Sequence, residues 1–190
     1  MARRYLLVAG MPGAGKSVVA RVARELGIPV FTMGDVVRRE VERRGLPPTP
    51  ANLNMVAREL RRLYGKTVIA ERTLEAIRES GVEGFVLVDG VRSLEEVEVF
   101  RRDGAVEILA VHASPRTRFE RLRSRGRPGD PSTWEEFVER DMMELGFGLG
   151  NVIALADYML VNDGVTLEEF RDAAKRLLTR IAGGRAEGHA

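Results

Sequence analysis

The sequence predicts an α/β fold in which an open, parallel, five-stranded sheet carries helices on both faces. Two observations predict it. Short, continuously apolar runs alternate along the chain with segments of helical periodicity, which is the order of a βαβ architecture. The apolar runs also lack a polar face, as expected of parallel strands covered on both sides. At 190 residues the chain suits one domain with one sizeable core.

Five apolar runs are the predicted strands. Each is short and bounded by polar or glycine-containing segments; they are Tyr5–Ala9, Pro29–Phe31, Phe85–Val88, Glu107–His112 and Asp157–Val161. Right-handed crossovers would place the carboxyl ends of these strands, and the loops that follow them, at one edge of the sheet. We therefore look for functional residues directly after each strand.

The helices between the strands have recognisable start signals. Ser114 followed by Pro115 predicts an N-cap with proline at the first helical position. Three further starts fit the capping-box pattern, in which a Ser or Thr precedes a Glu by three residues; they are Ser93–Glu96, Ser132–Glu135 and Thr166–Glu169.

The loop after the first strand carries the most informative motif. It fits Gly-x-x-x-x-Gly-Lys-[Ser/Thr], the phosphate-binding P-loop, and reads Gly10-Met11-Pro12-Gly13-Ala14-Gly15-Lys16-Ser17. Glycines let backbone N–H groups converge on phosphate oxygens, and the following helix N-terminus adds partial positive charge. Lys16 would reach the outer phosphates of ATP, and the Ser17 hydroxyl would bind Mg²⁺.

A second candidate site lies at the end of the third predicted strand, where Asp89 is followed by Gly90 and Arg92. A carboxylate at this place in a P-loop fold faces the Mg²⁺ directly or through water. Asp89 is therefore a predicted metal ligand and catalytic residue, and Arg92 is predicted near the phosphates. The alternative is that Asp89 is a turn or capping residue.

The segment after the second strand contains Asp35, Arg38 and Arg39. Arginines in the first turn of a helix oppose its dipole, which suggests that a bound anion compensates them. Asp35 is either a residue of the site or the cap of its helix, and the sequence leaves both readings open.

Two segments exceed what simple crossovers need. The first, residues 36–80, is helical throughout except for a break at 45–50, and the second, residues 116–131, is a helix that runs into a glycine- and proline-rich stretch. We expect an acceptor-binding insertion at 36–80 and a LID at 116–131, with plain surface elaboration as the alternative. A CORE made of 1–35, 81–115 and 132–182 completes a single domain at 1–182, followed by a disordered tail at 183–190.

The LID candidate is rich in arginine. Arg118, Arg121 and Arg125 have the spacing of one helix face. Their like charges repel one another, and a bound triphosphate would relieve this repulsion. Arg121 and Arg125 are predicted catalytic residues, and Arg127 is a predicted ATP contact. A solvated arginine face is the alternative.

Composition narrows the functional classes. The net charge of +2 is too small to argue for a nucleic-acid partner, although the sequence pI of 9.3 leaves one open. The absence of cysteine excludes disulfides and thiolate metal sites, and with two histidines we expect no histidine-built metal centre. No apolar run approaches a membrane span, and the first strand starts too early for a signal peptide, so we expect a cytoplasmic protein without membrane partners.

These motifs together resemble the nucleoside-monophosphate kinases, and most closely an archaeal P-loop kinase-like family related to dephospho-CoA kinase and adenylate kinase. The resemblance covers nearly the whole chain up to about residue 181 and rests on 10–17, 34–38, 89–97, 156–164 and the arginines Arg121, Arg125 and Arg127. It implies a CORE, an acceptor-binding region and a LID.

The resemblance also implies roles for individual residues. In adenylate kinases the arginine matching Arg38 holds the acceptor phosphate, and the Asp-Gly segment matching Asp89–Arg92 lines the active site. In dephospho-CoA kinases an aspartate at the place of Asp35 is the general base toward a ribose hydroxyl. The chain departs from adenylate kinase because no Phe-Pro precedes Arg92.

The sequence therefore predicts an ATP- and Mg²⁺-dependent kinase for a nucleotide-like, phosphate-bearing acceptor, with Asp35, Arg38, Asp89 and Arg92 as acceptor contacts. The alternative is an ATP-dependent switch or an ATPase that engages RNA or protein through its arginine surface. No aromatic-interleaved basic strand supports base stacking.

Overall fold

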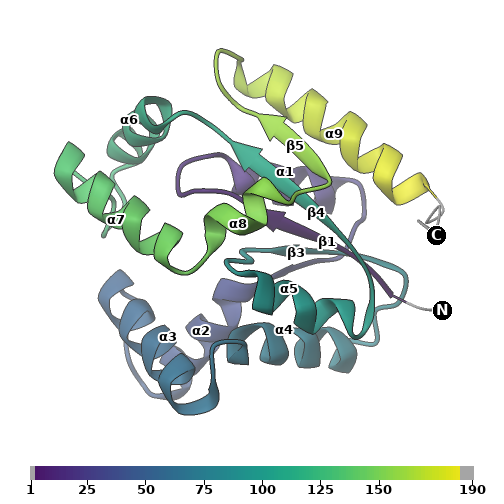
Figure 1. The fold of residues 1–190 in the computed structure, drawn as a ribbon, viewed down its shortest axis with the longest axis horizontal. Coiled ribbons are helices and arrows are strands. Elements are labelled where there is room, and N and C mark those ends of the chain that lie inside the picture. Colours follow the sequence, from purple (N-terminus) through teal and green to yellow (C-terminus); the bar gives the residue numbers. More distant parts are fainter. Residues whose placement is uncertain (1–2, 185–190) are drawn as a thin grey trace.

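A parallel five-stranded sheet forms the centre of the molecule (Figure 1). The computed structural model describes residues 3–184. The strands lie in the order β2-β3-β1-β4-β5, and their bounds are β1 (Arg3–Ala9), β2 (Val30–Thr32), β3 (Phe85–Asp89), β4 (Gly104–His112) and β5 (Tyr158–Val161). The predicted fold class is confirmed. All five predicted strands are present, each shifted, shortened or extended by at most a few residues.

Nine helices connect and cover these strands within residues 3–184. They are α1 (Lys16–Glu25), α2 (Met33–Arg43), α3 (Pro50–Tyr64), α4 (Val68–Glu79), α5 (Leu94–Arg101), α6 (Pro115–Arg125), α7 (Trp134–Gly146), α8 (Leu149–Ala154) and α9 (Leu167–Gly183). In Figure 1, α1 and α9 cover one face of the sheet, while α4, α5 and α8 cover the other.

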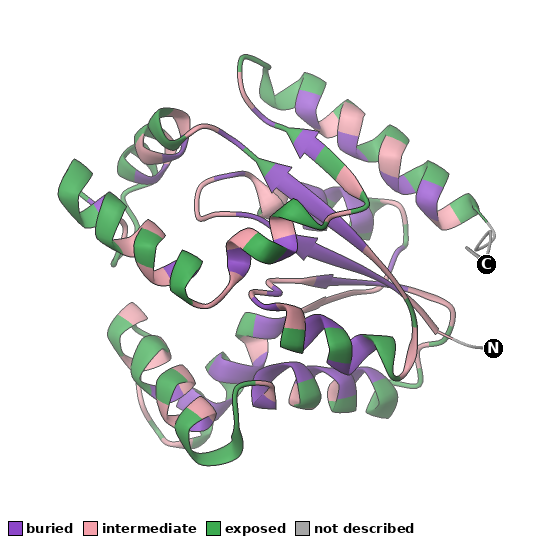
Figure 2. Cartoon of the chain, viewed as in Figure 1, coloured by how far each residue is buried: buried purple, intermediate pink, exposed green. Residues whose placement is uncertain are grey.

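The central strand β1 is buried on both faces (Figure 2), because its side chains alternate between two separate apolar clusters. Tyr5 and Leu7 pack with residues of α2, α4, α5 and α8. Leu6 and Val8 pack with residues of α1 and α9. The continuous apolar run that predicted a buried strand thus reflects burial on both sides.

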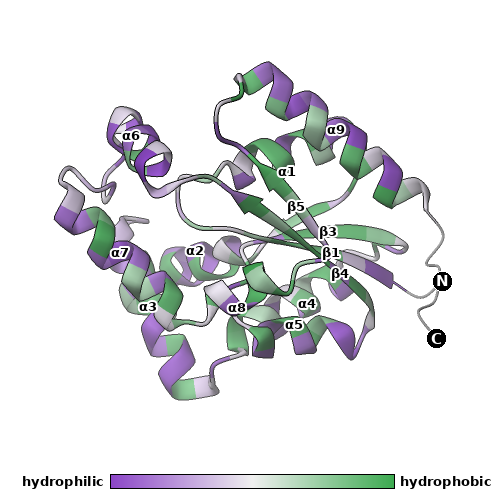
Figure 3. Cartoon of the chain, turned by 45° about the horizontal axis from the view of Figure 1, so that its top comes forward, coloured by the Kyte–Doolittle hydropathy of each residue, from purple (hydrophilic) through white to green (hydrophobic). Residues whose placement is uncertain are grey.

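Hydropathy follows the same division (Figure 3): the strands are hydrophobic, whereas α6 is largely hydrophilic. Polar helices project from the sheet on the side where its strands end, with α6 and α7 on one side and α2 and α3 on the other (Figure 1). These helices fall within or beside the predicted LID and acceptor-binding segments.

Two of the four predicted helix starts are confirmed as predicted. Ser114 caps α6, and Thr166 and Glu169 form a reciprocal capping box at α9. The box predicted at Ser132–Glu135 is wrong by one residue, because Thr133 and Glu136 form it.

At α5, Ser93 accepts from the Glu96 N–H as predicted, but the Glu96 carboxylate accepts from the backbone N–H of Arg92 instead of Ser93. The second hydrogen bond of that box is therefore donated one residue earlier than predicted, by the backbone N–H of Arg92.

The segment 36–80 contains a second break that the sequence analysis missed. Gly65 ends α3 with φ 99°, a conformation that favours glycine, so three helices occupy this part of the chain. At the other end, Gly183 lies in the last turn of α9, and residues 185–190 of the predicted tail lie outside the described residues. None of the helices described between residues 3 and 184 combines the length and apolarity needed to cross a membrane.

Glu40 holds the helices of this segment together. Its carboxylate, on α2, accepts hydrogen bonds from Arg43 and Arg44 and lies 3.7 Å from Arg72 of α4. Arg44 also donates a hydrogen bond of 2.8 Å from Nη1 to Oε2 of Glu59, on α3. The hydrogen bond from Arg43 is the largest cause that lowers the pKa of Glu40 from 4.5 to about 2.

This shift makes the stability of the protein dependent on pH. Because the pKa of Glu40 is lower in the folded chain, its stabilisation is complete above about pH 4.5 and is lost as the pH falls toward 2. We expect Glu40→Gln to lower the free energy of unfolding by about 1–3 kcal/mol at pH 7. Urea unfolding of both proteins between pH 7 and pH 3 measures this, and the difference should shrink on acidification.

Glu42→Gln is the matched control, since Glu42 lies on the same helix and is exposed. It should change the free energy of unfolding by less than about 0.5 kcal/mol. A Glu40→Gln difference that stays constant down to pH 3 would contradict the ionic role of Glu40.

Candidate functional site

The P-loop, residues 10–17, connects β1 to α1 and is enclosed by neighbouring elements. Gly13 has φ 83° and Gly15 has φ 113°, which a residue with a side chain adopts with strain. A Cβ on Gly13 would lie 2.9 Å from the carbonyl oxygen of Arg118, and one on Gly15 would lie 2.4 Å from Nδ2 of Asn162. The glycines of the motif are therefore required by close packing against α6 and the end of β5.

The N-terminus of α1 is built to receive an anion. It has no side-chain cap and no acidic residue in its first turn, whereas α7 and α9 begin with capping boxes. The N–H groups of a first helical turn have no partner within the helix. Together with the helix dipole they form an anion site.

Lys16 lies at this N-terminus and folds back over the loop. Its Nζ donates to the carbonyl oxygens of Gly10 and Met11. Burial lowers the pKa of Lys16, and the nearby carboxylates of Asp89 and Glu144 oppose that effect. Among the residues described, the hydrogen bonds of Lys16 go to backbone oxygens, which a phosphate group can replace without breaking an ion pair.

Asp89 ends β3 beside Lys16, as the sequence predicted. Its Oδ1 is buried and has no hydrogen-bond partner within the described residues. Burial raises the pKa of Asp89, and Lys16 opposes that shift most strongly. A buried, unpartnered carboxylate oxygen is costly unless a cation or donor completes it, so Asp89 fits a metal ligand. Ser17, the second predicted ligand, is exposed at the second position of α1.

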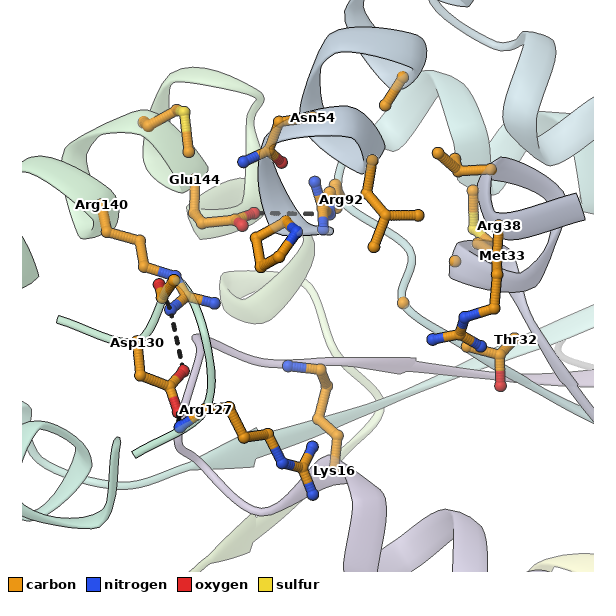
Figure 4. Close-up of a pocket in the computed structure, with 18 of the residues that line it drawn as sticks. Lys16, Thr32, Met33, Arg38, Asn54, Arg92, Arg127, Asp130, Arg140 and Glu144 are labelled. Carbon is orange, nitrogen blue, oxygen red and sulfur yellow. Dashed lines mark hydrogen bonds and ion pairs between the residues drawn. The ribbon is translucent and has the colours of Figure 1, made fainter. Parts of the chain in front are cut away.

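A cavity of about 780 Å³ opens at Lys16 and continues between α2 and α3 on one side and α7 on the other (Figure 4). Of the predicted site residues it is lined by Lys16, Arg38, Asp89, Arg92, Arg125 and Arg127. Asp35, Arg121 and Ser17 do not belong to its lining. One wall is apolar and is formed by Met33, Val37, Leu53, Ala57 and Ile69.

Asp35 does not cap its helix. Thr32 occupies the N-cap position of α2, and Asp35 is the third helical residue. Its carboxylate is 44% exposed and accepts a hydrogen bond of 2.7 Å from Arg38, which is 53% exposed. The two predicted acceptor contacts are thus paired with each other.

The predicted arginine stripe is not free. Arg118 is buried and makes a bidentate ion pair with Asp141 of α7, at 2.8 and 2.6 Å. It also donates to the carbonyl oxygens of Ala113 and Pro12 and lies over the ring of Phe137. Arg118 therefore fixes α7 to the P-loop, and the expectation that a triphosphate relieves the stripe was wrong for this residue.

Arg125 is likewise held by a carboxylate. Asp130, in the loop between α6 and α7, accepts from Arg125 and from Arg140 and also from the backbone N–H of Arg127. These hydrogen bonds, that of Arg125 first, lower the pKa of Asp130. The guanidinium of Arg127 extends near Lys16 (Figure 4); within residues 3–184, it has no carboxylate partner.

Arg121 contacts Asn162, the residue directly after β5, which packs against the P-loop. Its Nη2 donates to the backbone and side-chain oxygens of Asn162, whose Nδ2 donates to the carbonyl of Ala14. Its Nη1 is buried and without a partner among the described atoms. Arg121 thus faces the back of the P-loop and not the cavity.

Two contacts connect α3 with the loop after α6 and with α7, beside the cavity. A Cβ on Gly129 would lie 2.8 Å from the Cβ of Pro50, so the loop after α6 rests on the start of α3. Nη2 of Arg58, on α3, lies 3.4 Å from Sδ of Met143, on α7. The predicted LID therefore contacts the predicted acceptor-binding segment beside the cavity, and α7 contacts the same segment through Met143.

The cavity also contains residues that sequence reasoning missed. Arg61 of α3 lies 3.5 Å from Glu96, and Arg92 lies 3.5 Å from Glu144 of α7; both arginines lie over the ring of Phe147. Arg61 and Glu144 carried no motif in the sequence. Their roles depend on how α3 and α7 are oriented, which no local spacing reveals.

The Arg118–Asp141 pair gives a testable energetic expectation. Asp141→Leu leaves a buried guanidinium without its charge partner, which should lower the free energy of unfolding by about 3–5 kcal/mol. Arg118→Met combined with Asp141→Leu removes both charges and should recover most of that loss. Urea denaturation of the three variants measures the coupling.

Arg123→Met serves as the control, because Arg123 lies on the same helix and is exposed. Its effect should stay below about 1 kcal/mol. Additive losses in the double variant would show that Arg118 and Asp141 do not act as a pair.

Comparison with known proteins identifies relatives of this chain. A family model described as an AAA domain matches residues 9–138. A UPF0200 protein of Hyperthermus butylicus is 65% identical over 181 residues, covering 95% of this chain and 96% of its own.

Solved structures share the fold. Shikimate kinase from Bacteroides thetaiotaomicron superposes with a TM-score of 0.57 at 20% identity, covering 95% of this chain and 98% of its own. Shikimate kinase from Acinetobacter baumannii, in complex with shikimate, gives a TM-score of 0.59 at 17% identity, covering 98% and 97%. With a P-loop kinase-like fold and this degree of sequence identity, the chain belongs to the UPF0200 family.

Proposed function

We propose that this protein is an ATP-dependent kinase that transfers the γ-phosphoryl group to a small, nucleotide-like acceptor. The observation that carries the proposal is the cavity of about 780 Å³ that begins at Lys16. A protein that only binds or hydrolyses ATP needs no second space of this size beside its P-loop. The cavity lies where an acceptor would meet the outermost phosphate.

The residues divide between two substrates. The P-loop amides, Lys16 and Arg127 would hold the triphosphate, and the predicted LID, 116–131, would cover it. The acceptor would lie against the apolar wall of the predicted insertion, 36–80, with Arg38 and Arg92 near any phosphate that it bears. Two acceptor atoms fit this class: a phosphate oxygen, as in a nucleoside monophosphate, or a hydroxyl, as in a dephospho-CoA-like molecule.

Mg²⁺ is implied by the fold, and Asp89 and Ser17 supply oxygen donors of the kind it takes. The unpartnered Oδ1 of Asp89 fits this role. When bound, Mg²⁺ neutralises charge that develops on the phosphates.

The protein's own contribution is positioning and electrostatics. Lys16 and Arg127 place positive charge beside the transferred group. Arg118 and Asp130 fix α7 and the loop after α6, so these charges are oriented before the reaction. The contacts of Gly129 with Pro50 and of Arg58 with Met143 join the two sides of the cavity, and closure on bound substrates would limit futile hydrolysis. The shikimate kinases of the same fold act on a small acceptor, which supports this reading by analogy.

The proposal predicts the effect of removing the P-loop lysine. Lys16→Ala should lower kcat/KM for ATP-dependent phosphorylation by the equivalent of about 2–4 kcal/mol, because one preorganised donor to the phosphates is lost. The measurement is ADP release with a panel of nucleoside monophosphates, nucleosides and dephospho-CoA as acceptors.

Lys175→Ala is the control, since Lys175 is exposed on α9 and does not belong to the cavity lining. Its turnover should match that of the unmodified protein. Normal turnover in a folded Lys16→Ala protein, or the absence of Mg–ATP binding in titration calorimetry, would overturn the proposal. Steep salt-dependent RNA binding without acceptor turnover would instead favour the ATPase alternative.

A further inference from the structure

The acceptor end of the cavity is balanced in charge. Each of its three arginines has a carboxylate partner: Arg38 pairs with Asp35 at 2.7 Å, Arg61 with Glu96 at 3.5 Å, and Arg92 with Glu144 at 3.5 Å. At the P-loop end, by contrast, Lys16 is bonded to backbone oxygens. Within the described residues, positive charge without a direct ion-pair partner therefore lies at the P-loop end of the cavity, and not at its acceptor end.

Glu144 is the carboxylate that faces this acceptor space. It projects from α7 into the pocket toward Arg92 (Figure 4). Its side chain is 9% exposed, and its ion pair with Arg92 is 3.5 Å long, outside the usual range of a charge-assisted hydrogen bond. An ionised carboxylate can accept about four hydrogen bonds. Glu144 therefore retains accepting capacity that a ligand in the cavity can use.

Glu144 also lies close to the reacting end of the cavity. Its charge, with that of Asp89, acts on Lys16. Asp35, the residue that the family resemblance offers as a base, lies elsewhere: its carboxylate is 44% exposed, is bonded to Arg38 and does not belong to the cavity lining. Of these two carboxylates, Glu144 is the one that lines the cavity together with Lys16.

We infer that Glu144 is a catalytic residue that binds the phosphoryl-receiving hydroxyl of the acceptor, so that the substrate is an alcohol and not a phosphate monoester accepting through its phosphate. A carboxylate at this place would repel an acceptor phosphate but accept a hydrogen bond from a hydroxyl. The inference rests on the proposed function and narrows it to one of its two acceptor atoms.

With an acceptor R–OH, the acceptor oxygen forms a bond to the γ-phosphorus, and the bond from that phosphorus to the β,γ-bridging oxygen breaks. ADP leaves with the electron pair of the broken bond. The hydroxyl proton passes to the Glu144 carboxylate and then to water, which gives R–O–PO₃²⁻, ADP and H⁺.

Water is the probe acceptor for the first test, because it is an O–H acceptor that enters the cavity whatever the natural substrate is. We expect Glu144→Gln to lower the rate of Mg–ATP hydrolysis by about 10²-fold, since glutamine cannot take the proton. The Kd for Mg–ATP, measured by calorimetry, should stay within about twofold because Glu144 does not touch the P-loop. Glutamine keeps an oxygen toward Arg92, so the fold should persist in circular dichroism.

Two further variants separate chemistry from stability. Glu135→Gln alters an exposed glutamate of the same helix outside the cavity lining and should hydrolyse ATP at the unmodified rate. Glu144→Asp keeps the charge but withdraws it by one methylene, so it should be stable and still lose at least about tenfold in rate. Unchanged hydrolysis in both Glu144 variants, with ATP bound normally, would overturn this inference and leave the proposed function standing.

The second test reads the acceptor atom directly. The protein is incubated with ATP and a mixture of nucleosides, sugars and polyols, or with a mixture of nucleoside monophosphates, and the products are followed by phosphorus NMR. A new phosphomonoester that disappears with Glu144→Gln supports the inference. Formation of nucleoside diphosphates alone contradicts it, while still supporting a kinase. Failure to bind Mg–ATP at all contradicts the proposed function itself.

Discussion

The site depends on one constraint, which is that all five strands run in the same direction. Their carboxyl ends therefore meet at one edge of the sheet. β1 delivers the P-loop, β3 delivers Asp89, and β5 delivers Asn162 to the back of that loop. These residues are distant in sequence, and the hydrogen-bonded ladder of the strands brings them together.

Buried ion pairs then orient the helices that surround this edge. The Arg118–Asp141 pair ties α7 to the P-loop, and Asp130 ties the loop after α6 to both neighbouring helices. Such pairs add little net stability, because desolvation of the charges offsets their attraction. Their value lies in geometry, since a phosphoryl-transfer site requires charges that are in place before the reaction.

The structure changes the interpretation of the arginine-rich composition. The sequence suggested cations waiting for a phosphate, but the structure assigns many of them to carboxylates of the same chain. Within residues 3–184, Lys16 and Arg127 make no direct ion pair, and both lie at the P-loop end of the cavity. A protein with a net charge of +2 can thus keep cations without ion-pair partners at one end of a cavity and paired cations at the other.

The sequence by itself determined the strands, the P-loop and most helix starts, because these follow from local rules: continuous apolar runs, glycines with positive φ and caps within four residues. It also placed Asp89 correctly at the end of β3. The capping box at Thr133 was missed because Ser132 and Glu135 offered the same pattern one residue earlier. Tertiary structure alone decided that Asp141 holds Arg118, that Arg61 lies beside Glu96, and that Glu144 faces the cavity. Those outcomes depend on the relative orientation of helices far apart in sequence, which arises from packing against the sheet and leaves no periodic signal in the chain.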